Sequence, residues 1–192
     1  VKRSLALVYT VNPFGADHES SEHDPSYRGY PQKMAQLGLT DPQPDDVLNE
    51  EKVRYALTTQ YFYSAMNTLN LCQFVFGPSW QLYGPDHLLE AVRAITGWEA
   101  TMDDILALGE RRLNLQRAFN AREGIGREQD TLPKKMSKAL QGGKTDGARV
   151  TQEEVEKAKS LYYQMADWDV ETGTPTQEKL EELGLGWVAE MV

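Results

Sequence analysis

Cys72 is the only cysteine of the chain, and it ends the segment Asn67-Thr-Leu-Asn-Leu-Cys72. A thiolate can attack an electrophile or bind a metal ion, so this position could do chemistry. A reactive thiol needs a helix N-terminus or a nearby cation to lower its pKa, and the flanking sequence offers neither. A zinc site needs paired ligands at short spacings, and the chain has no CxxC or HxxxH. Local sequence alone therefore favours a small buried hydrophobic residue at Cys72.

The segment Asn12-Pro-Phe-Gly-Ala-Asp-His18 is the second candidate for chemistry, and it precedes Glu19, Glu22 and His23. A histidine beside acids in a loop can bind a metal ion or act as a general acid, and His18 could also pair with Cys72. The competing interpretation is a solvated polar loop, which the local sequence favours. His87 stands in the first turn of an expected helix and is interpreted as structural.

Two further groups of side chains have structural interpretations. The expected helix over 101–122 and the loop after it carry charges of both signs. This pattern predicts a mixed-charge surface, on which pairs of opposite charge at i,i+4 spacing stabilise the helix slightly. Its members are Glu110, Arg111, Arg112, Arg117, Arg122, Glu123 and Arg127. An aromatic set is expected in the core rather than around a ligand, and it consists of Trp98, Tyr162, Tyr163 and Trp168.

The elements that must position these residues are helices. Caps and apolar spacing predict helices over about 49–66, 84–95, 101–122 and 151–165, with a short helical piece around 134–140. A last helix is expected after a cap at Thr174 and Pro175, ending before Gly184. Residues 1–48 are expected mostly as loop, with a short strand or helical turn over 5–11, because prolines punctuate them. The fold class is therefore all-α and multihelical, with a loop-rich segment 1–48 and a helical domain 49–192.

Composition narrows the class of function. The 192 residues carry a net charge of −9 with a pI of about 4.9, and the longest basic clusters are pairs, so nucleic acid is not an expected partner. With 40% hydrophobic residues a packed core is expected. No apolar run approaches the roughly 20 residues that span a bilayer, so no membrane partner is expected. One cysteine is compatible with a reducing cytosol, and a cytoplasmic protein is expected.

Four segments of the chain form a pattern that their order and spacing make specific. GERRLNLQRAFNAREGIGREQDTLPKK covers residues 109–135, YYQMADWDVETGTPTQEKLEELGL covers 162–185, NPFGADH covers 12–18 and NTLNLC covers 67–72. Together they resemble the C-terminal region of the aldehyde:ferredoxin oxidoreductase family, whose members are tungsten- or molybdenum-pterin enzymes. NPFGADH resembles the family's loop that brings a histidine toward the active centre, and NTLNLC resembles its Asp-x-x-Gly-Leu-Cys. The resemblance covers nearly the whole chain.

The resemblance implies roles for four residues of NTLNLC. Cys72 would be the fourth ligand of a [4Fe–4S] cluster whose other ligands come from a Cys-x-x-Cys-x-x-x-Cys segment absent from this sequence. Asn67, Asn70 and Leu71 would contact the bis-pterin that holds tungsten or molybdenum. Asn67 stands where the family has Asp and can accept a hydrogen bond, but it lacks the charge. Asn70 stands in place of Gly, and asparagine tolerates a left-handed backbone. Leu71 matches the family and would contact the pterin through its backbone.

His18 would take or give a proton as an aldehyde becomes an acid, and no protein ligand to the tungsten is expected. The resemblance implies an enzyme that oxidises a small aldehyde to a carboxylate and passes electrons to ferredoxin. The expected partners are ferredoxin, the aldehyde, the N-terminal part of the same enzyme and, as an open alternative, further copies of the chain.

Because the sequence has no CxxC, the resemblance implies a C-terminal piece of such an enzyme that is expected to be inactive by itself, and the missing initiator Met agrees. Two alternatives stay open. One is a reductase of aryl-CoA thioesters on the same scaffold. The other is a degenerate, non-catalytic member with a structural or docking role, which the asparagines at 67 and 70 would suit.

Overall fold

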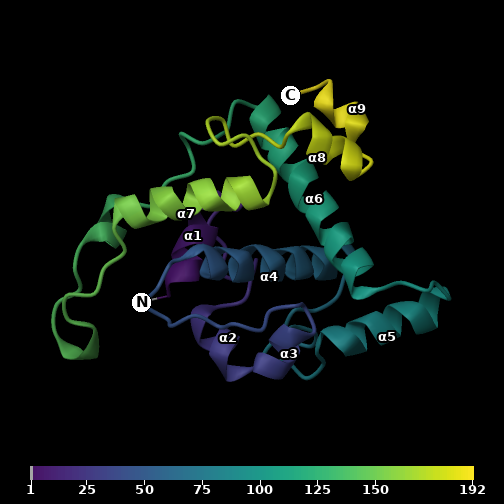
Figure 1. Ribbon diagram of the computed structural model, residues 1–192, viewed down its shortest axis with the longest axis horizontal. Helices are drawn as coiled ribbons and strands as arrows, with labels where there is room; N and C mark the ends of the chain where they lie inside the picture. Colours follow the sequence, from purple (N-terminus) through teal and green to yellow (C-terminus); the bar gives the residue numbers. More distant parts are fainter. Residues whose placement is uncertain (1) are drawn as a thin grey trace.

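The computed structural model describes residues 2–192, and within them the regular structure is helical (Figure 1). Two isolated β-bridges occur, Phe76 with Tyr83 and Trp168 with Pro175. The helices are α1 (Arg3–Val11), α2 (Asp24–Gly29), α3 (Pro31–Ala35), α4 (Glu50–Thr68), α5 (Pro85–Thr96), α6 (Met102–Arg122), α7 (Gln152–Met165), α8 (Gln177–Glu182) and α9 (Gly186–Ala189), with 3₁₀ turns η1 (Lys134–Ser137) and η2 (Gly143–Thr145). The expected all-α, multihelical class is confirmed.

Helix α4 lies at the centre, with α1 and α7 against one side and α6 crossing it steeply (Figure 1). The crossing with α6 is close because Gly109 has no side chain: a Cβ placed there would lie 1.8 Å from the backbone oxygen of Tyr61. The hydroxyl of Ser64 donates to the Gly109 carbonyl at 2.8 Å across the same contact. The N-terminal half of α6 is thereby fixed against the C-terminal half of α4.

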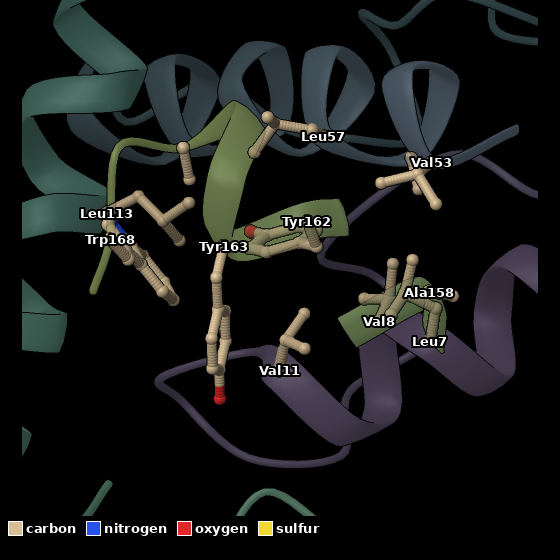
Figure 2. Close-up of a cluster of buried hydrophobic side chains, with 12 residues drawn as sticks. Leu7, Val8, Val11, Val53, Leu57, Leu113, Ala158, Tyr162, Tyr163 and Trp168 are labelled. Carbon is tan, nitrogen blue, oxygen red and sulfur yellow. The ribbon is translucent and has the colours of Figure 1, made fainter. Parts of the chain in front are cut away.

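A buried cluster joins α1, α4, α6 and α7 (Figure 2). Leu7, Val8 and Val11 of α1 meet side chains of α4 and α7, among them Leu57 and Tyr162. Trp168, just after α7, closes the cluster, and its indole N–H donates to Asn114 Oδ1 at 2.8 Å. Burying these apolar side chains is the main source of stability for the arrangement.

Residues 2–48 are less irregular than the sequence suggested, since they form α1, α2 and α3. They contain half of a fully buried ion pair that the sequence does not reveal: Lys52 Nζ lies 2.8 Å from Asp24 Oδ1, and both side chains are 0% exposed. Asp24 also accepts from the backbone N–H and the hydroxyl of Ser4, in the first turn of α1. These bonds tie the starts of α1 and α2 to α4, so prolines did not prevent ordered packing.

Several expectations need correction. Trp98 is 69% exposed, whereas Tyr162, Tyr163 and Trp168 are buried as expected. Arg117, expected on a charged surface, is buried. The helix expected after Thr174 begins at Gln177 and ends at Glu182, with Thr176 rather than Thr174 as its cap. Within residues 2–192, none of the helices combines the length and apolarity that a membrane crossing requires.

Candidate functional site

The turn after α4 holds the segment NTLNLC in a defined backbone shape. Asn70 has a φ of 56°, in the left-handed region. The N–H of Leu71 donates to the Met66 carbonyl and that of Asn70 to the Asn67 carbonyl, at 2.9 and 3.2 Å. This pair of bonds is the Schellman ending, which usually has glycine at the left-handed position. Asn70 thus adopts the left-handed backbone that asparagine was expected to tolerate.

Cys72 follows this turn and is exposed, so its interpretation as a buried hydrophobic residue is wrong. Its carbonyl accepts the backbone N–H groups of Val75 and Phe76, both at 3.0 Å, which fixes the backbone at the cysteine. The surface beside it is apolar, with Phe74 and Trp80 exposed and their rings 5.8 Å apart. Cys72 is therefore exposed on an ordered turn whose following segment carries the exposed side chains of Phe74 and Trp80.

A metal cluster held by this thiol would need ligands from elsewhere. Among the described residues, no group of three or more His, Cys, Asp and Glu side chains is placed to hold a metal ion. The donor chemistry nevertheless fits one ligand of an iron–sulfur cluster, because such clusters bind thiolates and Cys72 presents an exposed, free thiol on an ordered turn. Asn67 is also exposed, and its Oδ1 accepts from Gln73 Nε2 at 3.1 Å, leaving its amide N–H groups for another acceptor.

His18 lies on the loop between α1 and α2, with its side chain 63% exposed. Its Nε2 lies 3.1 Å from Glu19 Oε1, and its carbonyl accepts from His23 Nε2 at 2.7 Å. Lys2 Nζ lies 3.0 Å from His23 Nδ1. Because an ammonium group only donates, Nδ1 of His23 accepts and its Nε2 carries the hydrogen. His23 thus holds the His18 backbone, while the His18 ring stays exposed beside Glu19.

Glu22 belongs to the same loop, and it is buried, with only 2% of its surface exposed. Its Oε1 accepts the Tyr63 hydroxyl of α4 at 3.2 Å, whereas its Oε2 has no partner among the described residues. Burial raises the pKa of the Glu22 carboxyl to about 7, and the hydrogen bond from Tyr63 offsets part of this rise. The same bond links the His18 loop to α4.

A pocket of about 370 Å³ lies where the two candidate segments meet α6. The loop of residues 12–20 forms one wall, the end of α4 with Gln73 a second, and α6 the third. Its lining consists of Asn12, Phe14, Asp17, Ser20, Ser64, Asn67, Gln73, Arg112, Leu113 and Gln116. Polar side chains predominate, so the pocket suits a polar ligand rather than a purely hydrocarbon one.

The structure thus brings together part of the expected site. Asn67 and the loop that carries His18 share the pocket, while His18 and Cys72 are outside its lining. Sequence reasoning missed Glu22 and Arg112. The alternation of acids and histidines over 17–24 drew attention to the loop but does not distinguish the buried acid from the exposed ones. Nothing local distinguishes Arg112 from Arg111, because only the position of α4 decides which of them faces the pocket.

Comparisons with known proteins identify the family to which the chain belongs. Residues 1–185 match the family model described as aldehyde ferredoxin oxidoreductase, domains 2 and 3. Tungsten-containing aldehyde ferredoxin oxidoreductases from Pyrococcus horikoshii and Pyrococcus furiosus are each 32% identical over 183 residues, which is 93% of this chain. The chain spans only 27% of the length of these relatives.

Two other similarities are more distant. The WOR-like subunit of an aliphatic sulfonate oxidoreductase from Pyrococcus furiosus is 30% identical over 122 residues, covering 60% of this chain and 19% of that protein. A solved structure of the active-site complex BamBC of benzoyl coenzyme A reductase, bound to 1,5-dienoyl-CoA, superposes with a TM-score of 0.60. It covers 78% of this chain and 22% of that one at 20% identity, so it supports the fold alone.

Proposed function

Because the chain belongs to the aldehyde ferredoxin oxidoreductase family, we propose that it is the C-terminal helical region of an enzyme that oxidises aldehydes. In the proposed reaction an aldehyde and water give a carboxylate, and two electrons pass to ferredoxin. The match of residues 1–185 to domains 2 and 3 of the family is the observation that carries this proposal. The remaining part of the enzyme is its proposed partner.

The residues of this chain have proposed roles that follow their positions. Cys72 would hold one iron of a [4Fe–4S] cluster, and Asn67, Asn70 and Leu71 would contact a tungsten- or molybdenum-pterin through their polar and backbone groups. When bound, the cluster and the pterin-held metal would supply the electron transfer. The exposed ring of His18 exchanges a proton with substrate or water, with Glu19 as its neighbour 3.1 Å away. Asn67 presents amide N–H groups, which suits an acceptor atom on the ligand.

Cys72→Ala in the intact protein tests the ligand role directly. We expect loss of most of the cluster's iron and of aldehyde-dependent reduction of ferredoxin, because alanine has no donor atom. Thr68→Ala, an exposed change on the last turn of α4, is the matched control and should keep both iron content and EPR spectrum. Unchanged iron and EPR signals in Cys72→Ala would reject the ligand role.

We also propose that the 192-residue chain is inactive by itself, because its described residues offer one thiolate and no group of metal ligands. Stoichiometric tungsten and iron in the purified chain would contradict this.

Reduction of an aryl-CoA thioester on the same scaffold is the second candidate. Assaying the intact protein with an aldehyde and with an aryl-CoA thioester separates the two, and reduction of the thioester without aldehyde oxidation would replace the first proposal. A structural or docking role is the remaining alternative, which inactivity toward both substrates together with absence of metal would favour.

A further inference from the structure

Arg112 is a half-buried arginine on the α6 wall of the pocket, and it has no carboxylate partner among the described residues. Its closest bond is a long one, from Nη1 to Ser64 Oγ at 3.4 Å. By contrast, Arg117, Arg122 and Arg127 each contact a carboxylate. Burial without such a partner lowers the pKa of the Arg112 guanidinium. An anion bound beside Arg112 would offset the cost of burying its positive charge.

The surroundings of Arg112 favour an anion that also has a polar end. Gln116, one turn further along α6, lines the same pocket with its side-chain amide group. Asn67 adds free amide N–H groups. On the loop wall the pocket has one carboxylate, Asp17, whose Oδ1 accepts the Glu19 N–H at 2.9 Å. Phe14 and Leu113 supply apolar surface between these ends.

We propose that the Arg112 end of this pocket binds the carboxylate or sulfonate group of a small organic anion, with Gln116 as a second donor. A planar guanidinium matches the paired oxygens of such groups, and the bonds are charge-assisted. The carboxylate of Asp17 on the loop wall disfavours a second negative charge on the ligand. The assignment of this anion as part of the substrate rests on the proposed function, and makes the substrate an aldehyde that carries an acid group.

Binding can be measured on the 192-residue chain without metal or cluster. Butanoate and propane-1-sulfonate, titrated separately, should shift the side-chain amide NMR signals of Asn67 and Gln116 in a saturable way. Butanamide, which has nearly the same shape without the charge, should not. Arg112→Gln should weaken butanoate binding by about tenfold or more, as expected for loss of a charged hydrogen bond. Arg112→Lys should bind more tightly than Arg112→Gln.

Arg111→Gln is the matched control, because Arg111 is the adjacent residue of α6 but donates to the Leu183 carbonyl, away from the pocket. It should leave butanoate affinity within about twofold of the original. Equal binding of butanamide, or undiminished butanoate binding by Arg112→Gln, would overturn the proposal. Binding of inorganic phosphate without butanoate or propane-1-sulfonate would also overturn it, by making this a phosphate site.

The intact protein tests the substrate part separately. The ratio of kcat/KM for 4-oxobutanoate to that for butanal should fall by about tenfold or more in Arg112→Gln and stay constant in Arg111→Gln. An unchanged ratio would overturn the substrate assignment. If the original protein oxidises no aldehyde at all, the proposed function fails, and the titrations still decide the anion site.

Discussion

Glu22 is a carboxylate whose protonation depends on burial. Since burial raises its pKa to about 7 from 4.5, the folded protein keeps a proton on Glu22 at pH values where the unfolded chain has lost it. Stability contributed by this group is therefore greatest below pH 4.5 and decreases as pH rises from 4.5 to about 7. Above that range the Glu22 carboxylate is charged, and the folded state bears the full free-energy cost of burying that charge.

Glu22→Gln should remove this cost while keeping an acceptor for the Tyr63 hydroxyl. We expect the free energy of unfolding at pH 8 to rise by up to about 3 kcal/mol, with a much smaller gain at pH 5. Urea unfolding at the two pH values measures both. Glu99→Gln, at an exposed position, should change the free energy of unfolding by less than about 0.5 kcal/mol at either pH. A gain that is equal at pH 5 and pH 8 would mean that Glu22 does not titrate in this range.

At the scale of elements, the contact between α4 and α6 decides where the pocket lies. Gly109 permits the close crossing, and Arg112 and Gln116 follow it by one and two turns on α6. Because the pocket is made of side chains from both helices and a loop, a change in the crossing would move all its walls at once.

Gly109→Ala should destabilise the protein by about 3 kcal/mol or more, because its Cβ would lie 1.8 Å from the Tyr61 oxygen and backbone must move to accommodate it. Gly29→Ala is the control, since a Cβ at this helical glycine meets nothing within 4 Å. It should change stability by less than about 1 kcal/mol. Chemical unfolding compares the two, and similar stabilities would show that the crossing is looser than the structure indicates.

The helix starts could be predicted because their signals are local. Asn49, Thr101 and Thr151 each accept a backbone N–H three residues later, as the sequence predicted. The start of α8 could not be predicted this way. The Thr174 carbonyl accepts from Asp169 N–H and Pro175 pairs with Trp168, so Thr176 is left to cap the helix.

The residues of the candidate site divide in the same way. A left-handed backbone at Asn70 could be expected because asparagine stands there in place of the family's glycine, whereas the buried state of Glu22 and the exposure of Cys72 depend on packing between distant segments. Arg112 illustrates the limit, because its lack of a partner is a property of the assembled fold and has no counterpart in the residues beside it.

For the molecule as a whole, Arg117 connects the C-terminal third to the central helices. The buried guanidinium donates to Gly173 O at 2.6 Å and to Asp130 Oδ1 at 3.0 Å, and it lies 4.9 Å from the centre of the Trp168 ring. The Tyr163 hydroxyl donates to the other oxygen of Asp130. One side chain of α6 thereby joins the loop after it, helix α7 and the turn that leads to α8.

Arg117→Met should therefore cost about 3–5 kcal/mol, because it leaves the Asp130 carboxylate buried without its charged partner. Adding Asp130→Asn removes that charge, so the double variant should be more stable than the sum of the two single losses implies, by more than about 1 kcal/mol. Arg122→Met, which removes an exposed arginine paired with Glu123, should cost less than about 1 kcal/mol. Urea unfolding of the four variants gives these differences. Strict additivity would show that Arg117 stabilises the fold through packing on Trp168 rather than through Asp130, since packing on the ring does not depend on the carboxylate.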